Sequence, residues 1–339
     1  MKKFFVAIAI GLVSACSPAE VELPPVPEQT LQVASAMQLP LQQSGSYQVF
    51  DHEYTQLNAG PRELNVRLLS PKEAGEYPLL VFSHGFWSTQ GKYDALLAHW
   101  VSHGYVVASV DHVDCCSMPK GIFNSLRYGN LGLIEKRKQD IVSLMDQLPS
   151  LLEMHGLSGQ VLLDQVAITG HSFGGFTAQM FAGATATVDG AQVANEELSD
   201  ELLQKVKAVV AVSPPGPMFD EITPASWTSL NKPTLVTTGS WDVDARFFPD
   251  YRLHLTSFEQ APAGDKFALT LAGADHYFGQ LICRPEREVE PQTLQFEWLL
   301  AFSTAFLDHY LKGQSEPWLR LQAQNIEQIS QGFAHLNSK

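Results

Sequence analysis

The sequence predicts an α/β protein whose central sheet is mostly parallel and carries helices on both faces. Short apolar runs alternate with helical stretches between residues 46 and 312, as in chains built from repeated strand and helix units. No stretch rich in proline and glycine divides this region, so a single domain is expected there. Apolar residues make up 45% of the chain and charged residues 17%, which excludes a disordered protein.

Two kinds of strand are expected in this domain. Residues 47–55 and 64–70 largely alternate polar and apolar side chains, which indicates antiparallel strands with one buried face. Continuous apolar runs are typical of strands buried on both faces. Such runs occur at residues 78–82, 105–110, 166–169, 206–212, 234–238 and 267–271, and the last of them is interpreted as the final strand.

Helices are predicted at residues 92–103, 134–148 and 293–311. The second of these is expected to end before Pro149, because proline interrupts helical hydrogen bonding. Residues 111–130 and 183–201 break the alternation and are interpreted as long loops, which are often functional or mobile. Residues 313–339 are expected to form a peripheral helix or tail.

The first residues are typical of a bacterial secretory signal. Lys2 and Lys3 precede a ten-residue apolar run, too short for a stable membrane span. Residues 1–15 are therefore predicted to be removed. The sequence Val-Ser-Ala-Cys, ending at Cys16, resembles a lipobox, which implies a lipid-modified Cys16; an ordinary signal peptide that happens to contain a cysteine is the alternative. The lipobox implies anchoring to the cell envelope, and Ser17 favours the outer membrane, facing the periplasm or the surface.

Residues 16–45 contain several prolines and no clear strand or helix periodicity, so an extended tether is predicted there. Three further cysteines remain in the domain, at Cys115, Cys116 and Cys283. In an oxidising periplasm one disulfide and one free thiol are expected. We expect Cys283 to bond to Cys115 or Cys116, because adjacent cysteines rarely bridge each other.

A candidate nucleophile follows the strand predicted at residues 166–169. The sequence Gly170-His-Ser-Phe-Gly174 places Ser172 between a strand and a helix, in the arrangement of a nucleophile elbow. A sharp turn of this kind exposes the serine hydroxyl above the sheet, and the following helix directs its free N–H groups toward the same point. This pattern predicts a serine nucleophile for acyl transfer.

Four stretches together resemble the α/β-hydrolase superfamily. They are Val81–Phe86, Ser102–Val107 with Val110–His112, the elbow around Ser172 and Gly273–His276. The chain is most similar to bacterial dienelactone-hydrolase-like and platelet-activating-factor-acetylhydrolase-like serine esterases, near the cutinase-like polyester hydrolases. This resemblance implies an α/β-hydrolase fold and a Ser-His-Asp triad. Dienelactone hydrolases proper carry a cysteine where this chain has Ser172.

The remaining catalytic groups follow from this resemblance. His276 lies on the loop after the last predicted strand, where the family places its base. Asp242 follows the strand at 234–238 and matches the family's Gly-x-x-Asp pattern, with Asp244 as the alternative acid. The backbone N–H groups of Phe86 and Phe173 are the predicted oxyanion donors.

Other polar residues are interpreted as structural. Asp111, His112 and Asp114 follow a predicted strand and are expected to anchor loops or to form a polar rim. Arg137 and Asp140 lie three residues apart on a predicted helix and are interpreted as a surface ion pair. No metal site and no organic cofactor are expected.

The sequence therefore predicts a lipid-anchored serine hydrolase that cleaves carboxylic esters through an acyl-enzyme intermediate. A small-molecule or lipid-like ester is the expected substrate, and a monomer is the expected state. The net charge of −14 leaves no basic face for nucleic acid. Two alternatives stay open: a non-catalytic envelope lipoprotein that binds apolar ligands, and a hydrolase of amide or carbon–carbon bonds.

Overall fold

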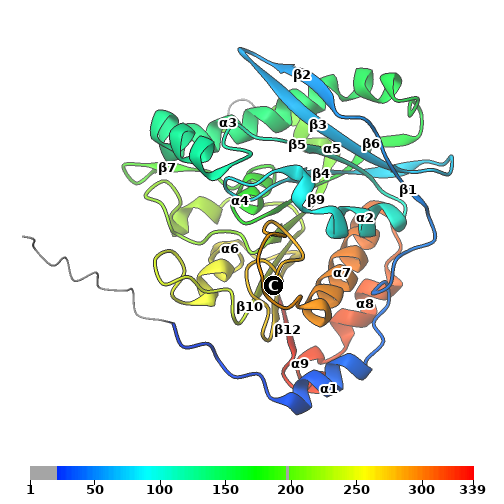
Figure 1. Cartoon of the computed structure of the whole chain (residues 1–339), viewed down its shortest axis with the longest axis vertical. Helices are drawn as coiled ribbons and strands as arrows, with labels where there is room; N and C mark the ends of the chain where they lie inside the picture. Colours follow the sequence, from blue (N-terminus) through cyan, green and yellow to red (C-terminus); the bar gives the residue numbers. More distant parts are fainter. Residues whose placement is uncertain (1–20, 196–197) are drawn as a thin grey trace, which may run out of the picture.

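A computed structural model describes residues 21–195 and 198–339, and a twisted central sheet runs through it (Figure 1). In spatial order its strands are β1 (Val49–Asp51), β3 (Arg62–Pro71), β5 (Val106–Val110), β4 (Tyr77–Ser83), β6 (Val161–His171), β9 (Val206–Val212), β10 (Thr234–Gly239), β11 (Lys266–Leu271) and β12 (Ala334–Ser338). The strand β2 (Thr55–Ala59) also pairs with β3. The six strands from β5 to β11 run parallel. The predicted fold class is confirmed.

The central strands are buried on both faces because successive side chains enter different apolar clusters. In β4, Leu80 and Phe82 belong to one cluster, whereas Leu79 and Val81 belong to the other. All seven residues of β4 are buried. Burial on both faces explains why these strands are continuous apolar runs in the sequence rather than alternating ones.

Helices cover both faces of the sheet. The first cluster includes side chains of α2 (Asp94–Ser102), α7 (Thr293–Leu307) and α8 (Glu316–Ala323). The second includes side chains of α3 (Met118–Met154), α4 (Phe173–Met180) and α5 (Asp200–Lys205). Figure 1 shows α2, α7 and α8 grouped on one side of the sheet and α3 on the other. A short helix α6 (Thr256–Gln260) lies between β10 and β11.

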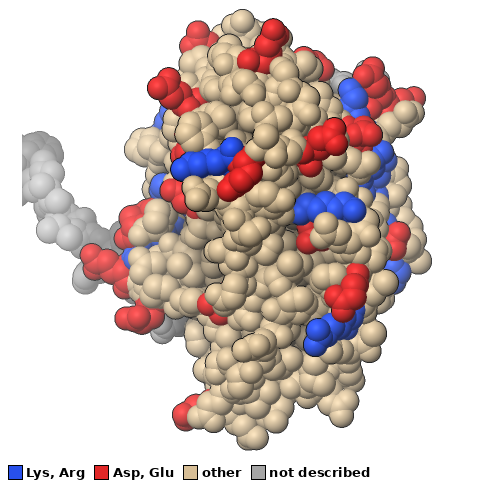
Figure 2. Space-filling model, turned by 90° about the vertical axis from the view of Figure 1, so that its right-hand side faces the viewer, with Lys and Arg blue, Asp and Glu red and all other residues tan. Residues whose placement is uncertain are grey.

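Surface charges of both signs are interspersed on the flank shown in Figure 2. Lysine and arginine side chains lie next to aspartate and glutamate over its upper part, and much of its lower part is uncharged. The excess of acidic residues therefore does not form a single patch on this flank. Among the residues that the structure describes, no helix is both long and apolar enough to cross a bilayer.

Three loop or strand predictions are wrong. Most of the segment predicted as a loop at 111–130 belongs to α3, which bends at Gly129 and continues past Pro149. Pro149 does not end the helix, because Leu148 and Leu151 on either side of it are anchored in the apolar core. The strand expected at 47–55 is divided into β1 and β2, and residues 183–201 include a small hairpin of β7 (Thr187–Val188) and β8 (Ala191–Gln192).

Both ends of the domain are more ordered than predicted. Part of the expected tether forms α1 (Glu28–Ala36), whose Thr30 and Ala34 are buried and whose Thr30 hydroxyl donates to the carbonyl of Gln331. These contacts are made by small residues, so the helix lacks a clear apolar periodicity. The tail contains α8, α9 (Ile326–Ile329) and β12, and β12 pairs antiparallel with β11. The residues after 312 therefore complete the domain.

Trp298 on α7 tests the packing of the first cluster. Its side chain is fully buried, with ring centroids 5.0 Å from Phe333 and 6.1 Å from Phe302. We expect Trp298→Ala to lower the free energy of unfolding by about 3–5 kcal/mol, because it removes apolar contacts and leaves a cavity. Chemical denaturation measures this change. Leu319→Ala, on the exposed side of α8, is the control and should stay within about 0.5 kcal/mol of the wild type.

Candidate active site

Ser172 lies at a strained turn between β6 and α4. Its backbone adopts φ 54° and ψ −126°, in a region that few residues other than glycine occupy. Two glycines make the turn possible. A Cβ on Gly170 would lie 2.2 Å from the carbonyl oxygen of Gly174, and a Cβ on Gly174 would lie 2.0 Å from that of Ser83. The predicted elbow geometry is therefore present at Ser172.

The first residues of α4 present N–H groups next to this serine. Phe173 is the first residue of the helix, where backbone N–H groups have no partner within the helix. In the described part of the chain, neither the N–H of Phe173 nor that of Phe86 takes part in a hydrogen bond. Neither predicted oxyanion donor is therefore occupied by a partner among the described residues.

His276 and Asp242 meet at the carboxyl ends of β10 and β11. His276 Nδ1 lies 2.7 Å from Oδ1 of Asp242, whose other oxygen accepts a hydrogen bond from the Thr238 hydroxyl at 3.0 Å. A carboxylate at Nδ1 fixes the tautomer in which Nε2 of His276 is the free acceptor. The alternative acid, Asp244, is exposed and accepts hydrogen bonds from the backbone of its own loop. The structure thus brings Asp242 to His276, and not Asp244.

A second histidine, His254, contacts the same carboxylate and was not predicted. It lies on a short 3-10 helix (Tyr251–Leu255), fully buried, with Nε2 3.0 Å from Oδ1 of Asp242 and Nδ1 2.7 Å from the carbonyl of Pro214. Both neighbouring atoms are acceptors, but Nε2 of His254 is not aligned for a hydrogen bond with the carboxylate. Burial alone would lower the pKa of His254, but the charge of Asp242 outweighs it and raises that pKa.

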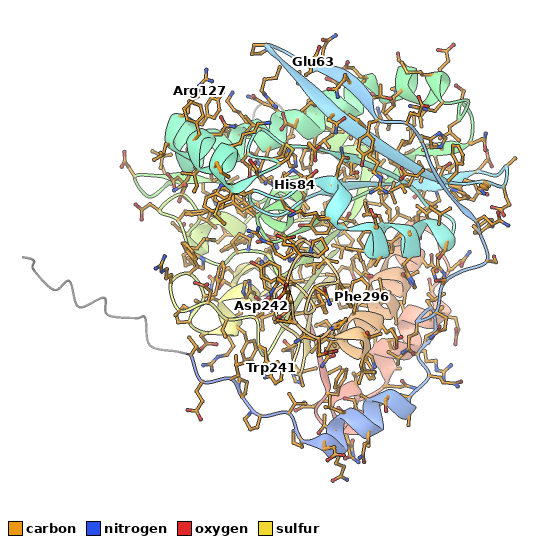
Figure 3. All side chains as sticks on the ribbon, in the orientation of Figure 1. Glu63, His84, Arg127, Trp241, Asp242 and Phe296 are labelled. Atoms are coloured by element: carbon orange, nitrogen blue, oxygen red, sulfur yellow. A yellow bond between two sulfur atoms is a disulfide. The ribbon has the colours of Figure 1, made fainter. Side chains whose placement is uncertain are left out.

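Asp242 is therefore a buried carboxylate between two imidazoles. Burial alone would raise the pKa of its carboxyl, but His254 and His276 outweigh this effect and hold the pKa well below its usual range. Asp242 stays ionised, and its side chain is held in one orientation by three neighbours. Figure 3 shows Asp242 in the interior of the domain and Trp241, the preceding residue, on the side of the N-terminal segment.

The residue before the serine connects the elbow to the His276 loop. His171 Nε2 donates to the backbone carbonyl of His276 at 2.8 Å, so its Nδ1 is the acceptor for the Tyr93 hydroxyl at 3.1 Å. Burial and the neighbouring His276 ring hold the pKa of His171 well below its usual value, consistent with a neutral ring. The Tyr93 oxygen in turn accepts the N–H of Gly85 at 2.8 Å. These hydrogen bonds join the elbow, the His276 loop and the loop that carries Phe86.

The loop after β4 is held by a buried ion pair. Arg137 donates to both oxygens of Asp114 at 2.8 and 2.7 Å and also to the carbonyls of His84 and Gly85. Asp114 further accepts the N–H of Trp87, which follows Phe86. His84 braces the same loop through its own hydrogen bonds to the carbonyl of Gly85 and to the N–H of His112.

The interpretation of Arg137 and Asp140 as a surface pair is wrong. Both side chains are completely buried; Arg137 pairs with Asp114, while Asp140 pairs with Arg62 and His112. One signal in the sequence points to this arrangement, because Arg137 falls on the same helical stripe as the apolar core residues of α3. The predicted role of Asp111 and Asp114 as loop anchors is confirmed by their hydrogen bonds to the loop at residues 87–90.

The predicted disulfide is also wrong. Cys115 bonds to its neighbour Cys116, and Cys283 is a buried free thiol. Cys283 belongs to the apolar cluster on the α2 and α7 face, where its N–H donates to the carbonyl of Lys92. Cys115 and Cys116 instead lie beyond β5, beside Lys120 and Asn124. The different positions of these residues in the fold explain why Cys283 pairs with neither.

Two groups in the described chain bring potential metal ligands together. Asp242, His254 and His276 form one, and Asp111, Cys115 and Cys116 the other. In the second group the sulfur atoms are bonded to each other and offer no thiolate. In the first, a single oxygen of Asp242 already faces both imidazoles, an arrangement typical of ion pairing. Neither donor set fits a resident metal ion well.

A cavity of about 910 Å³ opens beside His276. Trp241 and Tyr277 line it from the sheet side, and Leu23 and Leu31 from the N-terminal segment. Phe86 and Trp87 lie elsewhere, stacked on each other next to Phe173. Phe278, which follows Tyr277, is buried in the core.

Known proteins match this chain in sequence. The sequence model of the chlorophyllase family matches residues 41–216, just over half of the chain, including Ser172 and both candidate oxyanion donors. The chain belongs to the chlorophyllase family. The match to the family model ends at residue 216, before Asp242 and His276, so it does not test those two residues.

Curated relatives of this chlorophyllase-family chain match over shorter stretches. Platelet-activating factor acetylhydrolase from Cavia porcellus is 29% identical over 141 residues, covering 32% of each chain. Chlorophyllase-1 from Arabidopsis thaliana is 30% identical over 125 residues, covering 37% of this chain and 35% of the relative. The chain thus spans about a third of the length of the curated relatives it matches.

A solved structure supports the fold of this chlorophyllase-family chain. Dienelactone hydrolase from Anabaena variabilis ATCC 29413 superposes with a TM-score of 0.51 and 19% sequence identity. The match covers 78% of this chain and 99% of that structure. The predicted α/β-hydrolase fold is confirmed.

Arg137 provides a test of the buried ion pair. Arg137→Met keeps much of the side-chain volume but leaves Asp114 as an uncompensated buried charge. We therefore expect a loss of about 3–5 kcal/mol in the free energy of unfolding, measured by chemical denaturation. The double variant Arg137→Met/Asp114→Leu should recover part of this loss, because it removes both charges.

Arg252→Met is the matched control for that measurement. Arg252 pairs with Asp250 on the surface, where its side chain is 70% exposed. Its substitution should leave stability unchanged, because solvent screens exposed pairs. An Arg137→Met protein as stable as this control would contradict the structural role of the buried pair.

Proposed function

We propose that this chain hydrolyses carboxylic esters, with Ser172 as nucleophile, His276 as base and Asp242 as the acid that orients it. The observation that carries the proposal is the 2.7 Å contact between His276 and Asp242, located beside a serine elbow. The elbow and the His276 loop are joined directly, because His171 donates to the His276 carbonyl. The relatives, which include an acetylhydrolase, support ester hydrolysis.

The reaction proceeds in two acyl-transfer steps. Ser172 Oγ attacks the ester carbonyl while Nε2 of His276 takes the hydroxyl proton, and Asp242 stabilises the resulting imidazolium. The N–H groups of Phe86 and Phe173 bind the oxyanion. His276 then gives its proton to the departing alkoxide and leaves an acyl-serine. Water, deprotonated by His276, attacks this acyl group; the acyl–Oγ bond then breaks, His276 returns the proton to Ser172 Oγ and the acid is released.

Several side chains hold the reacting groups in place before the substrate binds. His254 and Thr238 hold Asp242 in place, and Arg137 fixes the carbonyls just before Phe86. Donors that are already aligned need not reorganise when charge develops on the substrate, and this is a large contribution in acyl transfer. Leu31, Trp241 and Val243 contribute apolar surface to the cavity beside His276, which suits an ester with an apolar portion.

We further propose that the protein is attached to the cell envelope by lipid at Cys16, after removal of residues 1–15. These residues lie outside the part of the chain that the structure describes, so the proposal rests on the sequence pattern. The described chain resumes at residue 21, and Trp241 Nε1 donates to the carbonyl of Pro24. A membrane-facing enzyme would meet small or lipid-like esters, and we propose these as substrates.

Ser172→Ala tests the nucleophile. We expect turnover of p-nitrophenyl esters to fall about 10⁴-fold or more, because the acyl-enzyme cannot form. Labelling by a fluorophosphonate probe should disappear together with turnover. Labelling that survives this substitution would contradict the assignment. A wild-type protein that turns over none of a panel of esters would instead favour a ligand-binding protein or a hydrolase of another bond.

Asp242→Asn and Asp244→Asn form a matched pair that tests the acid. Asp242→Asn should lower kcat about 10⁴-fold, because the amide cannot stabilise the His276 imidazolium. Asp244→Asn should leave kcat close to that of the wild type, since the exposed Asp244 carboxylate bonds to the N–H groups of Arg246 and Phe247 and not to His276. Steady-state kinetics on one p-nitrophenyl ester measures both, and the reverse order of effects would move the acid to Asp244.

A further inference from the structure

The first half of α3 has its apolar side chains on the outside. Met118, Ile122, Phe123 and Leu126 are 50%, 41%, 63% and 83% exposed. They recur at spacings of four, one and three residues, so they form one stripe along about two turns of the helix. A surface helix normally buries such a stripe in the core, so this stripe has no covering partner in the described chain.

The opposite side of this half-helix is small and polar, and specific contacts fix it to the domain. A Cβ on Gly121 would lie 2.1 Å from the Trp87 ring, so only glycine allows this close approach. Trp87 Nε1 donates to the Ser125 hydroxyl at 3.2 Å, and the Asn124 amide donates to the carbonyl of Val113 at 2.7 Å. These contacts hold the helix in the orientation that exposes the apolar stripe.

The charge of the same segment differs from that of the chain as a whole. Residues 115–134 contain Lys120 and Arg127 and no acidic residue, in a protein of net charge −14. Both cations are exposed, and Figure 3 shows Arg127 directed away from the sheet. They lie three and four residues from Phe123, so they border the apolar stripe. An exposed apolar stripe edged by cations is typical of helices that lie in a membrane interface.

We propose that the first half of α3 docks onto a lipid surface that carries anionic headgroups. Met118, Ile122, Phe123 and Leu126 enter the boundary between headgroups and acyl chains, while Lys120 and Arg127 contact lipid phosphates. A second copy of the chain is a poorer occupant. A stable dimer buries about 800 Å² on each partner from 20–30 residues, far more than this short stripe offers.

Docking by this helix would bring lipid close to the candidate oxyanion loop. Trp87, which packs under Gly121, stacks on Phe86 with ring centroids 4.6 Å apart. An ester held in the lipid surface would then be presented next to the Phe86 N–H. This last consequence rests on the proposed function, whereas docking itself does not.

Vesicle sedimentation tests the docking of the helix. The full chain carries Cys16→Ser in every sample, so that no lipid is attached and all N-termini are the same. Binding is compared on vesicles of phosphatidylcholine and on an equal mixture of phosphatidylcholine and phosphatidylglycerol. We expect Phe123→Glu/Leu126→Glu to weaken binding to the mixed vesicles about tenfold or more, because charges replace the apolar contacts.

Two further variants make the comparison specific. Leu319→Glu/Ile329→Glu adds the same charge at exposed apolar positions of α8 and α9 and should bind like the unsubstituted chain. Lys120→Ser/Arg127→Ser should lose the preference for phosphatidylglycerol without changing the apolar stripe. All variants should hydrolyse a soluble p-nitrophenyl ester equally well in the absence of vesicles, which separates a docking failure from a failure of the proposed activity.

Two outcomes would overturn the proposal. One is equal vesicle binding by the Phe123→Glu/Leu126→Glu and the Leu319→Glu/Ile329→Glu proteins. The other is a Phe123→Glu/Leu126→Glu protein that binds vesicles as before but changes its oligomeric state, as measured by sedimentation velocity. That result would make the stripe a contact between copies of the chain. If the Phe123→Glu/Leu126→Glu protein fails to fold, the Lys120→Ser/Arg127→Ser protein decides the test. An unchanged preference of that protein for phosphatidylglycerol would contradict the proposal.

Discussion

The close approach of the elbow to the end of β4 is the constraint on which the site depends. Gly174 lies so near the carbonyl of Ser83 that no side chain fits between them, and this contact locks the start of α4 against the sheet. It also places the loop after β4, with Phe86, next to the helix that begins at Phe173. The positions of the serine and of both candidate oxyanion donors therefore follow from one backbone contact.

Buried charge is the second determinant, and Arg137 and Asp140, for example, each have a fixed counterpart. Arg137 spans Asp114 and two carbonyls of the loop after β4, and His254 lies against Asp242. Burial raises the pKa of Asp140 to about 6 despite its contact with Arg62, which shows how strongly this interior opposes an isolated charge. Such pairs contribute little net stability, but they restrict the loops they join to one arrangement.

Local patterns in the sequence predicted the parallel strands and the elbow, because both depend on residues adjacent in the chain. The strand β4 and the turn at Ser172 are of this kind. The role of His254 could not be predicted, since it depends on how the segment between β10 and β11 folds over Asp242. The edge strand β12 and the helix α1 were missed for a related reason: short segments with few buried residues are defined by their neighbours in space.

The hydrogen bond between Trp241 and the carbonyl of Pro24 links the leading end of the chain to the residue just before Asp242. Val26 adds a contact at Gly273 on the strand-end loop that leads to His276. A shift of residues 24–26 would therefore reach the candidate acid and the His276 loop through one hydrogen bond and one side-chain contact.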